Sequence, residues 1–224
     1  MDIQVKGSIF KDHGFRAETN GNIKKLEINK YNYQNIRLNG LLTNNKYDGS
    51  LSIEDPNVKF DFQGGIDFSS QIPVFDFHAE ISKARLYKLN FVPEDTTANL
   101  SLTMMSNFRG NSLDNASGTI SLTRGSLTKN GEELNFDNLE VEARHRQDTH
   151  KISLSSDYLQ ANLVGRYRST TVYQSLKNLS LSYLPVFIQK AQDTSSVPYH
   201  NDFELSIDLN HTDRITDLFL PMMD

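Results

Sequence analysis

The sequence predicts an all-β protein built from antiparallel strands, and three observations carry this prediction. Apolar and polar residues alternate with a period of two along most of the chain, which is typical of strands with one wet face. Residues that favour turns recur between the alternating runs at short intervals. The connections are also too short for the crossover helices that parallel strands need.

The alternating runs follow one another from the start of the chain. They lie at 23–28, 36–42, 51–54, 60–62, 75–81, 100–104, 120–122, 134–143, 152–163 and 203–209. Turn signals stand between them, namely TNGN (19–22), TNNKYDG (43–49), EDPN (54–57), QGG (63–65), KNGEE (129–133) and RQDTH (146–150). At a typical strand length of about 5–8 residues, this spacing predicts roughly fourteen to sixteen strands in a meander.

Two places break the period of two. Val172, Leu176, Leu179 and Tyr183 are spaced as one stripe of a helix, so we expect a short helix near 171–183, although residues 179–183 also alternate as a strand would. A second short helix is expected at 213–220, before Pro221. The polar segment 190–202 is expected to be a loop. We expect one continuous domain over residues 1–224.

Composition excludes several classes of function. The net charge of −5 leaves no basic footprint for nucleic acid. The absence of cysteine removes disulfides, thiolate zinc sites and cysteine nucleophiles. The chain also lacks the HExxH, GxSxG and GxGxxG motifs. We therefore expect no enzyme activity, no catalytic residue, no metal site and no cofactor.

The stretch VKFDFQGGIDFSSQIPVFDFHAEI (58–81) sets three aspartates among phenylalanines. Asp61, Asp67 and Asp76 would suit calcium only if they gathered in one loop. Each instead stands between two large apolar residues, so we expect the aspartates on a solvated strand face and the aromatic residues on the other. His145 and His150 flank a predicted hairpin turn and are expected to form a surface pair.

Phe60, Phe62, Phe68, Phe75 and Phe77 would form one apolar wall if their strands are in register. Burying such side chains contributes about 1.5–3 kcal/mol each, so something must cover them. The sequence pattern alone is compatible with two ways of covering this wall. One is a second sheet or closure into a barrel, and the other is an open, strongly curved sheet whose apolar face holds acyl chains.

A family resemblance bears on this choice. Residues 31–68, YNYQNIRLNGLLTNNKYDGSLSIEDPNVKFDFQGGIDF, resemble TamB-like proteins of the AsmA-like superfamily. The matching positions are Asn35, Ile36, Leu38, Gly40, Tyr47, Gly49, Leu51, Ile53, Asp55, Pro56, Asn57, Gly65, Ile66 and Phe68. LDNASGTISLTRGSL (113–127), SYLPVF (182–187) and DLNHTDRITDLFLP (208–221) are also similar to family segments.

The resemblance implies an elongated, strongly curved antiparallel sheet, a taco-shaped β-groove lined by apolar residues. It implies the periplasm of a diderm bacterium, in a parent protein anchored in the inner membrane. The implied function is phospholipid transport between inner and outer membranes in outer-membrane biogenesis. We expect a middle segment of the longer protein, whose other regions would contact an outer-membrane barrel protein and whose cut edge strands would favour a dimer.

We expect the groove to bind phospholipid acyl chains through the following lining residues: Ile53, Phe60, Phe62, Phe68, Phe75, Phe77, Leu100, Leu102, Met104, Ile120, Leu122, Leu139, Val141, Ile152, Leu154, Leu205 and Ile207. Ordinary core packing is the competing role for each. Two other functions remain open, a scaffold of a translocation and assembly module that captures unfolded strands at a sheet edge, and a ligand- or carbohydrate-binding β-sandwich.

Overall fold

The computed structural model describes residues 2–10, 14–168, 171–172 and 201–210, of which 2–10 and 14 are described by their backbone only. They form these strands: β1 (Asp2–Phe10), β2 (Gly14–Ile28), β3 (Tyr31–Thr43), β4 (Lys46–Glu54), β5 (Val58–Asp67), β6 (Val74–Arg85), β7 (Asn99–Arg109), β8 (Ser117–Lys129), β9 (Glu132–Arg146), β10 (Thr149–Ser156), β11 (Leu159–Arg166) and β12 (Asp202–Leu209).

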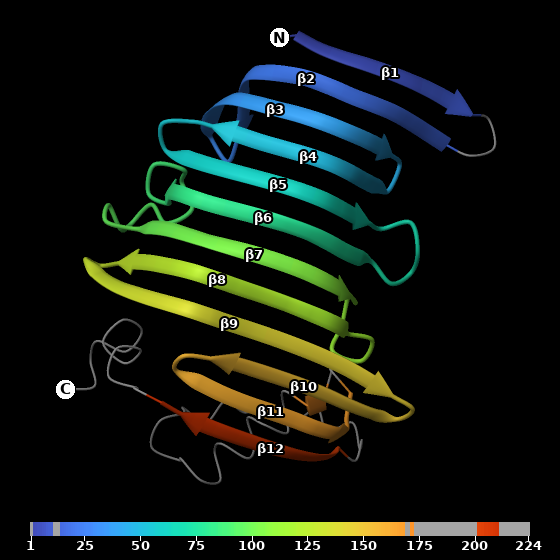
Figure 1. Cartoon of the computed structure of the whole chain (residues 1–224), viewed down its shortest axis with the longest axis vertical. Coiled ribbons are helices and arrows are strands. Elements are labelled where there is room, and N and C mark those ends of the chain that lie inside the picture. The colour runs from blue at the N-terminus through green and yellow to red at the C-terminus, as the bar shows by residue number, and fades with distance from the viewer. Residues whose placement is uncertain (1, 11–13, 169–170, 173–200, 211–224) are drawn as a thin grey trace, which may run out of the picture.

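The strands lie side by side in chain order in one sheet, from β1 to β12. Every neighbouring pair is antiparallel. Figure 1 shows an elongated, twisted ladder with β1 at one end and β12 at the other. The predicted all-β, antiparallel fold is confirmed.

The sheet forms a single open layer. Within the described ranges, strands in extensive contact are always neighbours in the chain, so neither a second sheet nor closure of β12 onto β1 is seen there. The predicted elongated, curved sheet is therefore confirmed over a sandwich. Backbone groups of the inner strands are satisfied by the ladders on both sides.

The strands are longer than predicted. The described residues form twelve strands of 8 to 15 residues, whereas the expectation of roughly fourteen to sixteen strands over the whole chain assumed a typical length of about 5–8 residues. The predicted turns at 19–22 and 63–65 are wrong, since both segments lie inside strands, β2 and β5. Gly64 has φ 134° and lies close to the backbone of Phe77 within the ladder, so this glycine allows a close approach of two strands rather than a turn.

In two of the tight turns, two consecutive residues adopt positive φ. Asn130 and Gly131 do so between β8 and β9, as the KNGEE signal predicted. Asn29 and Lys30 do so between β2 and β3, at a turn that the sequence did not suggest. Two positive φ values in a two-residue loop match the twist of a β-hairpin.

One long connection, between β6 and β7, folds back over the sheet. Asn29 and Asn90 exchange side-chain to backbone hydrogen bonds of 2.8 and 3.0 Å, which fix this connection to the β2–β3 turn. The buried carboxylate of Asp95 accepts the backbone N–H of Asn130 at 2.6 Å, which fixes it also to the β8–β9 turn. That N–H and the Thr97 hydroxyl lower the pKa of Asp95.

The predicted helices at 171–183 and 213–220 and the loop at 190–202 lie outside the described residues, apart from 171–172 and 201–202. In the part of the chain that the structure describes, there is no helix long and apolar enough to cross a membrane.

Candidate functional site: an open apolar face

Strand register places the apolar residues on one side of the sheet. Paired residues on neighbouring strands point to the same side. One cross-strand row runs through Leu38, Leu51, Phe62, Ala79, Met104, Leu122 and Leu139. We call the side that carries this row the apolar face.

Parallel rows extend the apolar face to the later strands. The next row holds Phe77, Ser106, Ile120, Val141, Leu154, Ala161 and Ile207. Beyond it lie Tyr47, Ile66, Phe75, Phe108, Gly118, Ala143, Ile152, Leu163 and Leu205. On the other side of the first row lie Ile23, Ile36, Ile53, Phe60, Ile81 and Leu102, and then Val58, Ala84, Leu100, Leu127 and Leu134.

The predicted lining residues therefore share one face. All of them fall into these five rows except Phe68, which follows β5 and packs its ring edge-on against Phe75 at 5.7 Å. The predicted aromatic wall also forms, since the ring of Phe62 lies 5.2 Å from that of Phe77 and the ring of Phe75 lies 6.4 Å from that of Phe108.

Side chains of the apolar face cover one another only in part. Phe62 is 9% exposed, but Phe68 and Ile207 remain 53% and 55% exposed. Most of the other predicted lining residues are half-buried. A contiguous apolar surface of this extent normally marks a binding site, because leaving it in water forgoes the free energy of burial.

At one end of the strands, the apolar face is covered by the β6–β7 connection. Leu89 of this connection is 2% exposed and forms a buried cluster with Tyr33, Ile36, Val58 and Ala84. Ile53, Phe60 and Leu100 pack against the cluster. These three predicted lining residues thus belong to an ordinary core, and the open part of the face lies away from them.

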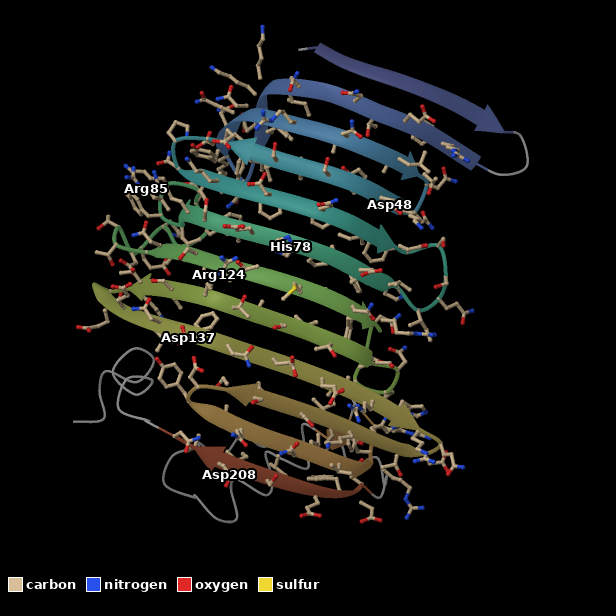
Figure 2. All side chains as sticks on the ribbon, viewed as in Figure 1. Asp48, His78, Arg85, Arg124, Asp137 and Asp208 are labelled. Carbon is tan, nitrogen blue, oxygen red and sulfur yellow. The ribbon has the colours of Figure 1, made fainter. Side chains whose placement is uncertain are left out.

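The opposite side of the sheet is polar. Asp61 pairs with Ser52 and Glu80 across the ladder, and Asp76 pairs with Asn107. Figure 2 shows charged and polar side chains, including Asp48, His78 and Asp208, along the length of the sheet. The predicted placement of the three aspartates on a solvated strand face is confirmed for Asp61 and Asp76, which are exposed.

Asp67, the third aspartate, serves a local hydrogen-bond network. Its carboxylate accepts the Ser69 hydroxyl at 2.5 Å and the Ser69 backbone N–H at 2.8 Å, and it lies 3.8 Å from Lys46. The Ser69 hydroxyl and N–H lower its pKa, and the Lys46 ammonium adds to this. Among the residues described, no three His, Cys, Asp or Glu side chains are arranged to hold a metal ion.

The polar side is hollowed over its N-terminal half. A shallow depression of about 570 Å³ lies over β2–β6. Its lining includes a cross-strand row of amide, hydroxyl and imidazole groups, Asn20, Asn39, Ser50, Gln63 and His78. These groups can hydrogen-bond water or a polar ligand, so this depression suits a polar ligand better than an acyl chain.

His145 and His150 meet across the β9–β10 hairpin, as expected. Their Nδ1 atoms lie 2.9 Å apart, and their ring centroids 4.4 Å apart. Burial lowers the pKa of His150, and the His145 ring adds to this, which favours the neutral imidazole. Burial also raises the pKa of nearby Tyr167 to about 12.

Sequence reasoning missed several residues of the apolar face. Leu38, Leu51, Tyr47, Ile66 and Phe108 lie in the same rows as the predicted lining residues. Their signal was available, since Leu38 and Leu51 stand in alternating runs. Phe108 and Tyr47 were harder to find, because only the register shows which strand residues they face.

Comparisons with known proteins identify no relative, since no family model, no curated protein and no solved structure matches the chain. The family resemblance of residues 31–68 therefore stays a prediction.

Proposed function

We propose that the apolar face binds the acyl chains of phospholipids, in a segment of a periplasmic β-groove of the TamB-like kind that carries lipid between the inner and outer membranes. The observation that supports this most is the continuous, half-exposed apolar face itself. It extends over the sheet without a second layer among the described strands.

The dimensions suit hydrocarbon chains. Twelve strands at a spacing of about 4.8 Å extend over roughly 50 Å. An acyl chain in one leaflet reaches about 15 Å, half of the bilayer's hydrocarbon core. The face is therefore long enough for several chains, and one chain can lie at many positions along it.

The chemistry of the face favours sliding over fixed binding. Contact between an acyl chain and apolar side chains removes water from both surfaces and contributes about 25 cal/mol per Å². This contribution does not depend on any one hydrogen bond. Neighbouring rows of leucine, isoleucine, valine and phenylalanine would hold a chain with similar affinity at each step.

Lipid content of the purified protein tests the proposal. The 224-residue chain is produced in a diderm bacterium and purified without detergent, and its organic extract is analysed by mass spectrometry. We expect co-purified phospholipid, and we expect added phospholipid to displace the uncharged apolar dye Nile red from the protein. A lipid-free extract together with no dye binding would rule out acyl-chain binding.

The same preparation separates the proposed function from that of an assembly scaffold. A scaffold would capture unfolded β-strands at a sheet edge by strand addition. Such capture would be blocked by proline substitutions in an edge strand and left intact by charges on the apolar face.

A further inference from the structure

A second hollow, of about 500 Å³, lies at one end of strands β9–β11. It is lined by Asp114, His145, Gln147, Asp148, His150, Arg166, Tyr167 and Arg168. The acyl-chain function leaves these residues unused.

This hollow adjoins the apolar face. His145, His150, Gly165 and Phe203 form the next cross-strand row beyond Ala143, Ile152, Leu163 and Leu205. The ring of Tyr167 lies 5.2 Å from that of His150 and 6.4 Å from that of Phe203. A lipid lying on the outermost apolar row would thus place its polar end at the hollow.

The hollow carries charges of both signs. Arg166 and Arg168 supply guanidinium groups, whose planar donors match phosphate oxygens. Asp114 and Asp148 supply carboxylates, which suit an ammonium group. Arg166 is bound to Asp202 at 3.2 Å, and both side chains are about two-thirds exposed, so the pair is weak enough to rearrange around a ligand.

One buried polar group in this region lacks a partner. Tyr167 is 2% exposed, and its buried hydroxyl has no hydrogen-bond partner within the described residues. Buried hydroxyls almost always have a partner, so this group keeps an unused donor beside the charged hollow, which a ligand reaches if the ring shifts toward it.

We propose that the hollow binds a zwitterionic phospholipid head group, with a phosphodiester near the arginines and histidines and an ammonium near Asp114 and Asp148. The inference rests on the proposed acyl-chain function. It adds a preference for zwitterionic over purely anionic lipids, which the two carboxylates provide, and it makes Tyr167 a residue that contributes a hydrogen bond to the bound head group.

The test compares ligands that differ in one part. Binding of dihexanoyl phosphatidylethanolamine, dihexanoyl phosphatidylglycerol, phosphoethanolamine and inorganic phosphate is measured by calorimetry below the micelle concentration, and Nile red reports on the apolar face. We expect roughly tenfold tighter binding of phosphatidylethanolamine than of phosphatidylglycerol, as one well-placed ionic contact provides.

Tyr167→Phe is the decisive variant. It should melt at the same temperature as the wild type or higher, because it removes a buried hydroxyl that has no partner. It should nevertheless bind phosphatidylethanolamine severalfold more weakly, with Nile red binding unchanged. His78→Ala, a change on the polar side far along the sheet, is the control and should alter neither.

Three outcomes would overturn the inference. They are equal affinity for the two lipids, an unchanged affinity in Tyr167→Phe, or phosphate competing as well as the zwitterionic lipid, which would indicate a free-phosphate site. Each leaves Nile red binding, and with it the acyl-chain function, intact. Loss of Nile red binding with phosphoethanolamine still bound would instead reject the acyl-chain function alone.

Discussion

The phenyl ring of Phe136 lies against Gly125 on the neighbouring strand, in the space that a Cβ at position 125 would occupy. Gly64 and Gly165 also lie opposite a phenylalanine, Phe77 and Phe203, but a Cβ there would meet a backbone carbonyl and the partner's Cα and Cβ rather than its ring. Of these three glycines, Gly125 is the one whose backbone an aromatic ring covers.

Gly125→Ala should destabilise the fold by about 1–3 kcal/mol, because the new methyl group overlaps the Phe136 ring and forces it to move. Urea denaturation measures the loss. Gly65→Ala is the matched control, since the nearest atom to a Cβ there lies 3.6 Å away, and it should be neutral within about 0.5 kcal/mol.

A second substitution checks the mechanism. In the Phe136→Ala background, Gly125→Ala should cost much less than it does alone, because the obstructing ring is gone. An equal cost in both backgrounds would contradict the overlap and point to the backbone of Gly125 instead.

Asp55→Asn should cost about 1.5–3 kcal/mol, the range for a hydrogen bond to a buried charged group. Asp55 is 3% exposed, and both of its oxygens are used. Oδ1 accepts the Tyr31 hydroxyl at 2.5 Å, and Oδ2 accepts the Gln34 N–H at 3.0 Å. An asparagine would turn its NH₂ group toward one of these donors. Thermal melting measures the effect.

Asp157→Asn is the control for this substitution. Asp157 accepts the backbone N–H groups of Asp137 and Asn138 through Oδ2 alone, at 2.6 and 3.3 Å. An asparagine can turn its carbonyl oxygen to the same place, so we expect a loss below about 0.5 kcal/mol. Similar losses for the two variants would show that using both oxygens of Asp55 is unimportant.

Met104→Glu and Met105→Glu form a matched pair that tests the apolar face. The two methionines are adjacent in β7, but Met104 lies in the row of Phe62 and Leu122, whereas Met105 pairs with His78 on the polar side. A charge at position 104 should abolish most phospholipid and Nile red binding, because removing a carboxylate from water costs several kcal/mol. The same charge at 105 should leave binding unchanged.

The folding of the two variants decides what a loss of binding means. Circular dichroism and melting temperature should show both variants folded, because half-exposed Met104 can keep its carboxylate near water. If only Met104→Glu unfolds, as a charge in a closed core would, this position is core and the open face is smaller than proposed.

The all-β fold could be predicted because apolar and polar residues alternate along the strands. Asp61 stands between Phe60 and Phe62, which predicts a sheet with one polar and one apolar face, and the strand register confirms this. The open layer could not be predicted from composition, because the same phenylalanines would be expected in a sheet covered by a second one. Leu89 illustrates the difficulty. Its burial depends on a connection that returns to Asn29, sixty residues earlier in the chain.

Of the candidate site residues, some could be predicted from the sequence and others could not. His145 and His150 were predictable as a pair, since a two-residue turn fixes which residues meet across a hairpin. Tyr167 was not, because its burial and its unpaired hydroxyl depend on packing beside β10 and β12 rather than on any local pattern.

His150 should make the protein less stable in mild acid. Burial and the nearby His145 ring lower its pKa below the ordinary value, and this outweighs the opposite effect of Asp114 and Asp148. The unfolded chain, in which histidine has a pKa of about 6.5, then binds the proton more readily than the folded chain. Stability from neutral His150 is fully present above about pH 6.5 and is lost as the pH falls through the folded pKa.

Two measurements check this prediction. NMR titration should give His150 a pKa below the ordinary histidine value of about 6.5. Urea denaturation at pH 7 and pH 5 should show a smaller loss of stability in His150→Asn than in the wild type. A His150 pKa at or above the ordinary value would contradict the packing of the two rings, because it would require a solvated imidazole.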